Sequence, residues 1–215
     1  MNRPTLSRRL VHTGALLAGL LAFNTSQAGD AALYAPIAPK GSAFVRLYNA
    51  ANQEVSASLG SAKFDDVAPL GSSAFSYLAK GDYSAQVGTQ SLPVRLAGDQ
   101  YYTLVNLPSG APKLVEEPIF KNKQKALIRV HNLSDKALVL KTADGKTEVV
   151  KRVAPQGRGD REINPVKVSL ALYDGQRKVS DLKPVSLPRG EIVSLFITGS
   201  GSQLSPVWVK RPDVE

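Results

Sequence analysis

The sequence predicts an all-β protein built from two tandem, duplicated antiparallel β-sandwich domains. Three observations predict this fold class: an internal repeat that keeps its order, apolar residues that alternate with period two, and glycine-containing turn signals between short strands. No window of a dozen residues shows a helical stripe. We expect the domains to cover residues 29–112 and 113–215, because a unit of this size can bury a modest core without disulfides.

The first 28 residues have the pattern of a cleaved export signal. A positive region, an apolar run and a small-residue cleavage site follow one another: Arg3, Arg8 and Arg9, then residues 10–23, then Ser26-Gln27-Ala28. The apolar run is too short for a confident membrane span. We therefore expect an exported mature chain that begins at Gly29, while the Arg8-Arg9 pair leaves the general and the twin-arginine export routes both open.

The internal repeat consists of short strings that recur in the same order. The matches are Pro36-Ile37 with Pro118-Ile119, Ala43-Phe44-Val45-Arg46-Leu47-Tyr48-Asn49 with Ala126-Leu127-Ile128-Arg129-Val130-His131-Asn132, Val67-Ala68-Pro69-Leu70-Gly71 with Val153-Ala154-Pro155-Gln156-Gly157, and Gly98-Asp99 plus residues 101–105 with Gly190-Glu191 plus residues 193–197. The offset between the copies grows from 82 to 92 residues along the chain. Collinear matches separated by small loop insertions indicate duplication of one structural unit.

Each copy also shows strands and turns at the local level. Period-two alternation predicts strands over residues 44–48 and 167–173. Asp144-Gly145 predicts a turn between strands at residues 138–141 and 147–150, and Asp174-Gly175 predicts a second turn. Glycine favours such turns because it accepts positive φ.

Composition excludes several kinds of chemistry. The chain has no cysteine, which removes disulfides, cysteine-bound zinc, iron–sulfur clusters and thiol catalysis. The mature chain would keep His131 as its only imidazole, in the repeat position that Tyr48 holds in the first copy. Neither a Gly-x-Ser-x-Gly elbow nor a Gly-Asp-Ser block with a downstream Asp-x-x-His occurs. We therefore predict no catalytic residue, no metal site and no cofactor.

Positive charge is concentrated in the second copy. Residues 29–112 hold five basic and six acidic side chains, whereas residues 113–215 hold nineteen and twelve. Such a field suits an anionic polysaccharide or an acidic protein partner, and an exported chain is not expected to meet nucleic acid. Basic residues, with aromatic residues that can stack on sugar rings, form the predicted polymer- or partner-binding set: Lys146, Lys151, Arg152, Arg158, Arg161, Arg129, Tyr102 and Trp208.

Strings near the start of the mature chain resemble a known family. Gly29-Asp30-Ala31-Ala32-Leu33-Tyr34-Ala35-Pro36 and Phe44-Val45-Arg46-Leu47-Tyr48-Asn49, together with the signal, are similar to the AlgF family of pseudomonads over essentially the whole chain. The resemblance implies a periplasmic accessory protein for alginate O-acetylation. It also implies a membrane-bound acyltransferase and periplasmic SGNH-type alginate O-acetyltransferase proteins as partners.

Three hypotheses for function remain open at this stage. The first is a non-catalytic adaptor that docks the acetylation partners, which would supply the nucleophile, base and oxyanion hole. The second is a polysaccharide-binding module that holds alginate through basic and aromatic residues. The third is an acetyl-group carrier or transferase that uses a serine or His131.

Overall fold

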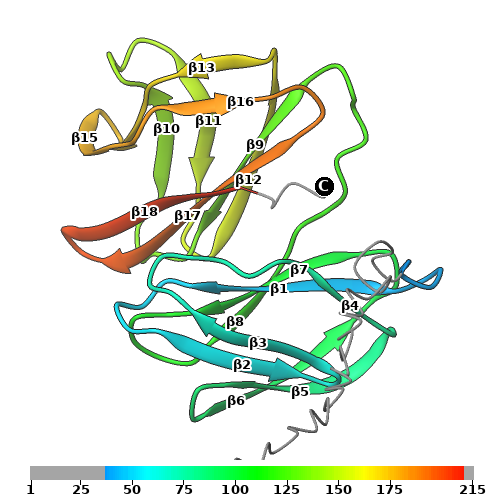
Figure 1. Cartoon of the computed structure of the whole chain (residues 1–215). Coiled ribbons are helices and arrows are strands. Elements are labelled where there is room, and N and C mark those ends of the chain that lie inside the picture. Colours follow the sequence, from blue (N-terminus) through cyan, green and yellow to red (C-terminus); the bar gives the residue numbers. More distant parts are fainter. Residues whose placement is uncertain (1–36, 211–215) are drawn as a thin grey trace, which may run out of the picture. The chain divides into compact units, whose positions relative to one another are not determined.

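The structure is a computed structural model that describes residues 37–210. Every regular element within these residues is a β-strand, numbered β1 to β18, which confirms the all-β prediction (Figure 1). The described residues from Ala38 onward belong to one compact unit. The predicted signal peptide and the expected mature start at Gly29 lie outside the described residues.

Two four-stranded sheets form what we call the first sandwich, with strand orders β4-β1-β7-β8 and β3-β2-β5-β6. Its strands are β1 (Ala43–Asn49), β2 (Val55–Leu59), β3 (Ala62–Val67), β4 (Ser76–Leu78), β5 (Gly81–Val87), β6 (Gln90–Leu96), β7 (Tyr101–Asn106) and β8 (Lys113–Glu116). Side chains from both sheets, among them Leu47, Leu59, Phe64 and Leu104, meet in one apolar core. Alternation along the strands supplies this inward-facing set.

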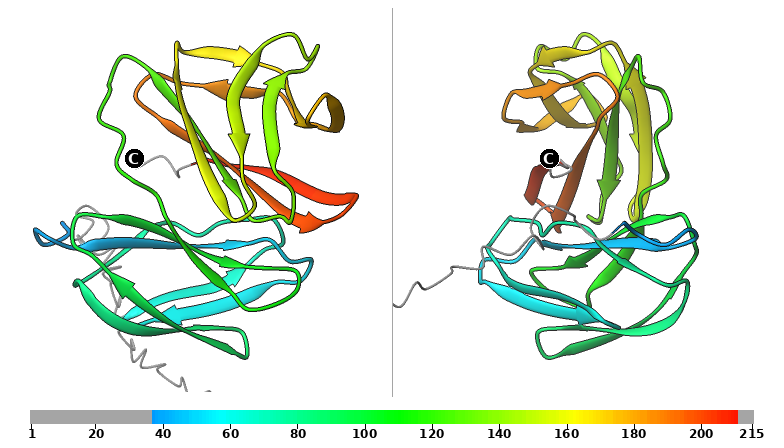
Figure 2. Two further views of the ribbon diagram at one scale, coloured as in Figure 1. Left: turned by 180° about the vertical axis from the view of Figure 1, so that it is seen from behind. Right: turned by 45° about the vertical axis from the view of Figure 1, so that its right-hand side comes forward.

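The second sandwich contains sheets of order β12-β9-β17-β18 and β11-β10-β14-β15, with a small β13-β16 pair. Its strands are β9 (Ala126–Asn132), β10 (Leu138–Thr142), β11 (Glu148–Val153), β12 (Gly157–Ile163), β13 (Val166–Val168), β14 (Leu170–Asp174), β15 (Arg177–Asp181), β16 (Val185–Leu187), β17 (Ile192–Ser200) and β18 (Gln203–Lys210). Ile128, Leu140, Leu172 and Leu195 lie in its core. Figure 2 shows the strands of each sandwich arranged in layers.

One strand pair in each sandwich departs from the antiparallel prediction. β1 runs parallel to β7, with Arg46 beside Thr103, and β9 runs parallel to β17, with Arg129 beside Ser194. The other strand pairs of the described residues are antiparallel, as predicted. The chain visits the opposite sheet between the two parallel partners, so no hairpin forces them to run in opposite directions.

The predicted duplication is visible in matching hydrogen bonds. The Nδ2 of Asn49 donates to the Gln53 carbonyl at 2.7 Å, and the Nδ2 of Asn132 donates to the Lys136 carbonyl at 2.6 Å. Both amides also donate to the carbonyl of the last residue in the third strand of their copy. This residue is Val67 in the first copy and Val153 in the second. Each asparagine is fully buried, so these bonds fasten a loop to the core in both copies.

The last sequence match of the repeat is wrong by one residue. The equivalent of Asp99 is Gly190, because both have positive φ, 57° and 77°. Each also donates its N–H to the carbonyl of the residue that precedes the first strand of its own sandwich. The register of the two parallel strand pairs supports this match. Tyr101 lies beside Phe44 in the first sandwich, and Ile192 lies beside Leu127 in the second. The sequence instead suggested that Asp99 matches Glu191, because the two acids look alike. Backbone conformation, not side-chain likeness, defines the correspondence.

Two further boundaries differ from the sequence prediction. Lys113–Glu116 forms β8 and pairs with β7, so the change from the first to the second sandwich follows Glu116 rather than residue 112. The single strand expected over residues 167–173 is divided at Ser169 into β13, which pairs with β16, and β14, which pairs with β10 and β15. The turns at Gly145 and Gly175 are confirmed, with φ of 74° and 62°.

Candidate functional site

Three of the predicted basic residues are exposed cations on neighbouring strands. Lys151 and Arg152 lie on β11, where the register against β10 shifts by a residue, and Arg161 lies on the following strand, β12. Within residues 37–210 none of the three forms an ion pair or a side-chain hydrogen bond. Of the other three, Lys146 pairs with Asp144 in a turn and Arg158 pairs with Asp160, so both are partly neutralised.

Arg129 is a structural residue rather than the exposed binding residue that the sequence predicted. Its side chain is 2% exposed and forms a fork with the Asp160 carboxylate, through Nε at 3.1 Å and Nη2 at 2.8 Å. Its Nη1 donates to the Pro118 carbonyl at 2.9 Å. An arginine held in this way satisfies a buried charge with planar geometry and is not available to a polymer.

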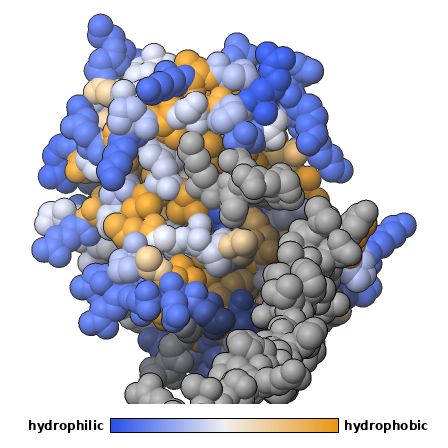
Figure 3. Space-filling model, in the orientation of Figure 1, coloured by the Kyte–Doolittle hydropathy of each residue, from blue (hydrophilic) through white to orange (hydrophobic). Residues whose placement is uncertain are grey.

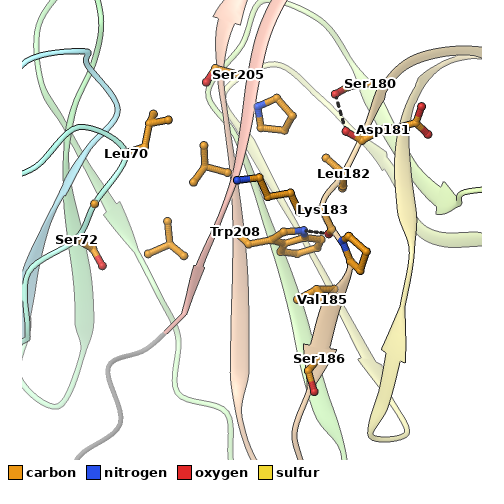
Figure 4. Close-up of a pocket in the computed structure, with 15 residues that line it drawn as sticks. Leu70, Ser72, Ser180, Asp181, Leu182, Lys183, Val185, Ser186, Ser205 and Trp208 are labelled. Atoms are coloured by element: carbon orange, nitrogen blue, oxygen red, sulfur yellow. Dashed lines mark hydrogen bonds between the residues drawn. The ribbon is translucent and has the colours of Figure 1, made fainter.

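The two predicted aromatic residues have different environments. Tyr102 is only 7% exposed, packs in the first core and accepts the Ala97 N–H through its hydroxyl, so it cannot stack on a sugar. Trp208 is half-buried and lines a cavity of about 850 Å³. Its Nε1 donates to the Lys183 carbonyl at 3.1 Å, which fixes the indole in place (Figure 4).

Equivalent positions of the two copies pack together in a contact that we call the joint. Tyr48, Val105 and the half-buried Val115 lie on the outer face of the β4-β1-β7-β8 sheet, and Phe196 and Val209 lie on the outer face of the β12-β9-β17-β18 sheet. The rings of Tyr48 and Phe196 are 4.8 Å apart at their centroids. This cluster removes the apolar part of both outer faces from water.

The polar side of the joint is organised by Glu117, in the segment that connects the two sandwiches. Its carboxylate accepts from Arg46 Nη2 at 2.7 Å and Ser194 Oγ at 3.1 Å, and also from Thr103 Oγ1. The Arg46 and Glu117 side chains are 1% and 4% exposed. Burial alone would raise the pKa of Glu117, but the charge of Arg46, the charge that His131 carries when protonated, and the hydrogen bonds from Thr103 and Arg46 lower it to about 2.

His131 lies in the same joint and is kept neutral. Its ring stacks on Phe196 with centroids 4.7 Å apart, and it is 2% exposed. Burial lowers the pKa of His131 to about 4, against the opposing charge of Glu117. Its Nε2 and the hydroxyl of Tyr48 are buried without a hydrogen-bond partner among the described residues. Burial also raises the pKa of Tyr48 to about 12, so both groups are uncharged near neutral pH.

This arrangement offers a ligand little chemistry at the joint. A general base must reach its substrate, and the imidazole of His131 is covered by Phe196 and flanked by Arg129 and Arg158 charges that oppose its protonation. No cluster of three or more metal-ligating residues occurs within residues 37–210. The same residues include no helix long and apolar enough to cross a bilayer.

The cavity at Trp208 brings together three segments of the chain. They are residues 70–72 of the first sandwich, residues 180–186 around the start of β16, and residues 205–209 of β18. Figure 3 shows apolar side chains gathered across the middle of one face, with hydrophilic side chains on either side. Leu70, 48% exposed and with φ of 58°, contributes to the rim of the cavity.

Sequence reasoning missed Glu117, whose carboxylate accepts hydrogen bonds from residues of both sandwiches. The sequence assigns no role to this residue, and its partner Arg46 lies 71 residues away. One signal was present in the sequence: Arg46 and Arg129 recur at equivalent strand positions, and a charge repeated within an apolar strand requires a buried partner. The partners themselves differ between the copies, so the repeat could not identify them.

Comparison with known proteins gives consistent results. The family model described as "Alginate O-acetyl transferase AlgF" matches residues 15–194. A Pseudomonas fluorescens protein named alginate biosynthesis protein AlgF is 67% identical over 213 residues, which cover 99% of this chain and 98% of the relative. The protein of the same name from Pseudomonas aeruginosa is 67% identical over 198 residues, covering 92% of this chain and 91% of the relative.

Two solved structures also match parts of the chain. One is the C-terminal domain of AlgF from P. aeruginosa, with 73% identity and a TM-score of 0.39, covering 41% of this chain and 100% of that chain. The other is the N-terminal domain of the same protein, with 61% identity and a TM-score of 0.34, covering 38% and 99%. Since the family model and the relatives both extend over most of the sequence, this chain belongs to the AlgF family of alginate biosynthesis proteins.

Proposed function

We propose that this protein is a non-catalytic periplasmic adaptor in alginate O-acetylation. It docks a membrane-bound acyltransferase and SGNH-type acetyltransferase proteins near the nascent polymer, and these partners supply the reacting groups. The observation that carries the proposal is the position of His131, which is buried against Phe196 and flanked by the charges of Arg129 and Arg158. An imidazole placed there stabilises the joint and has no route to an acetyl donor.

The joint supports an adaptor role in a second way. Apolar contacts connect the two sandwiches, as does the carboxylate of Glu117, which accepts from Arg46 of the first sandwich and Ser194 of the second; the exposed surfaces of both are therefore held in one arrangement. A scaffold that docks two partners gains from such preorganisation, because less freedom is lost when the second partner binds.

The test of this proposal is binding together with acetylation in cells. Purified mature chain is titrated against the purified SGNH-type acetyltransferase of the same alginate system, and alginate acetylation is measured in cells that carry either wild type or His131→Gln. We expect saturable binding, and we expect His131→Gln to keep acetylation near the wild-type level. Acetyl transfer to mannuronate oligomers by the purified chain alone, lost in His131→Gln, would contradict the proposal.

A second candidate function is direct binding of alginate, favoured by the exposed cations Lys151, Arg152 and Arg161. Uronate carboxylates would attract such side chains, with an affinity that falls as salt screens the charges. We expect reversal of all three charges to abolish any calorimetric binding of polymannuronate at low salt, whereas Lys63→Glu on the first sandwich leaves it unchanged. Absence of binding by wild type at low salt would remove this candidate.

A further inference from the structure

The outer edge of β18 is an unpaired strand edge. β18 pairs with β17 along eight residue pairs, from Val193/Lys210 to Ser200/Gln203, and it ends the β12-β9-β17-β18 sheet. Within residues 37–210 no strand pairs with its other side, and its backbone makes no other backbone hydrogen bond. A strand edge of this length offers a template on which another extended segment can form main-chain hydrogen bonds.

The register of the hairpin identifies which backbone groups face outward. The two-residue turn at Gly201 and Ser202 closes on the pair Ser200/Gln203, so alternate residues after Gln203 turn their backbone groups away from β17. These are Leu204, Pro206 and Trp208. Proline has no N–H to donate, and an outward position on an edge strand is where its absence costs no ladder hydrogen bond.

Apolar side chains flank this edge on both sides. Figure 4 shows Leu70 and Ser72 on one side of β18, and Trp208, Leu182 and Val185 on the other. The cavity of about 850 Å³ therefore includes the strand edge itself, with an apolar wall on each side of it. A strand added there would direct successive side chains alternately to the two walls, because side chains of a strand alternate between its faces.

The charge of the cavity is set by one residue. Asp181 and Lys183 are its only charged lining residues among those described, and Asp181 is paired with Lys178 at 2.9 Å. Lys183 forms no ion pair within the described part of the chain, and Figure 4 shows its side chain extended toward β18. An incoming segment with a carboxylate at this point would be complementary to the free ammonium group.

We propose that β18 accepts an extended segment of a partner protein as an additional strand. The segment carries apolar side chains at alternate positions, which enter the cavity on both sides of β18, and an acidic residue that pairs with Lys183. This inference rests on the proposed adaptor function and specifies how one partner is held. The lone Pro206 lowers the number of bonds available and so disfavours indiscriminate strand pairing.

The direct test is amide hydrogen exchange resolved to single residues on the mature chain, with and without saturating SGNH-type acetyltransferase. The outward amides of Leu204 and Trp208 exchange quickly in the free protein and are expected to slow at least tenfold when a strand is added. The amides of Ser205 and Val207 donate within the β17–β18 ladder and are slow in both states. Contact through side chains alone would not produce this alternating pattern.

Matched charge reversals accompany the exchange measurement. Lys183→Glu is expected to weaken binding of the acetyltransferase at least tenfold, and Lys63→Glu, an exposed lysine on β3 remote from the cavity lining, is expected to leave it unchanged. Binding that leaves Leu204 and Trp208 unprotected overturns the strand-addition inference and leaves the adaptor function standing. Protection that grows with the concentration of this chain alone assigns the edge to a second copy and overturns it as well. Absence of binding to the acetyltransferase overturns both proposals.

Discussion

Replacing Glu117 by glutamine tests whether the buried ion pair holds the two sandwiches together. The substitution keeps the shape of the side chain and removes the carboxylate charge that faces the guanidinium of Arg46, a side chain with 1% exposure. Breaking one side of a buried pair typically costs about 3–5 kcal/mol. The depression of the Glu117 pKa from 4.5 to about 2 leads to a similar value, about 3 kcal/mol.

The assay is urea unfolding of the mature chain as a function of pH. Because the folded-state pKa of Glu117 lies below its unfolded value of 4.5, its contribution is complete above pH 4.5 and is lost as pH falls toward 2. Wild type is therefore expected to exceed Glu117→Gln by about 3 kcal/mol at pH 7, with the difference shrinking below pH 4.5.

An exposed ion pair gives the control for this measurement. Asp82 lies 3.8 Å from Arg95, and both side chains are largely exposed, at 79% and 85%. Asp82→Asn is expected to lower stability by less than about 1 kcal/mol, because solvent screens such pairs. If Glu117→Gln costs no more than Asp82→Asn, the joint does not hold a buried ion pair and the reasoning about it is wrong.

Three further outcomes follow from the described contacts. Burial lowers the pKa of His131 from 6.5 to about 4, so the folded state is fully stable above pH 6.5 and loses stability as the pH falls toward 4. His131→Gln is therefore expected to flatten the pH dependence of the urea midpoint between these two values. If the slope is unchanged in the variant, the pH dependence belongs to another group. Asn49→Ala and Asn132→Ala are each expected to lower the free energy of unfolding by about 2–3 kcal/mol in the same assay, because each removes at least two hydrogen bonds of a buried amide. A large difference between the two losses would contradict the equivalence of these residues. Gly190→Asp is expected to cost about 1 kcal/mol and less than Gly190→Val in thermal unfolding, because Asp99 adopts the same positive φ in the first copy; equal losses would argue against that match.

The sequence was most informative where local pattern and repeat agreed. Period-two alternation predicted the strand that the structure shows as β1, and the recurrence of its residues, with Asn49 repeated as Asn132, indicated the equivalent strand β9. The match was wrong by one residue at Asp99, because it paired two acidic side chains, Asp99 and Glu191. The equivalent residue is Gly190, which shares the positive φ of Asp99. Strand pairing between β7 and β8 could not be inferred, since residues 113–116 carry no turn signal that ties them to either copy.

The candidate site was only partly predictable for a related reason. Arg129 points away from the second core, as alternation along its strand indicates. Its side chain nevertheless lies on an outer face of the sheet that is covered by Pro118 of the connecting segment and by Asp160. In a single sandwich the same face would be exposed to solvent, which is what the sequence suggested. Lys151, Arg152 and Arg161 could be predicted as exposed cations, because charged side chains are rarely buried without a partner. Contacts between distant segments, such as Glu117 with Arg46, depend on tertiary packing that no local pattern records.

The joint is built from equivalent positions of the two copies. Val105 corresponds to Phe196, Val115 to Val209 and Tyr48 to His131, so each copy contributes the same strand positions to the contact. A lone ancestral copy would have exposed this patch and gained stability by self-association. Within one polypeptide the contact is intramolecular and the two halves need not be identical: the arginine of the first copy pairs with an acid in the connecting segment, and that of the second pairs with an acid on the edge strand β12.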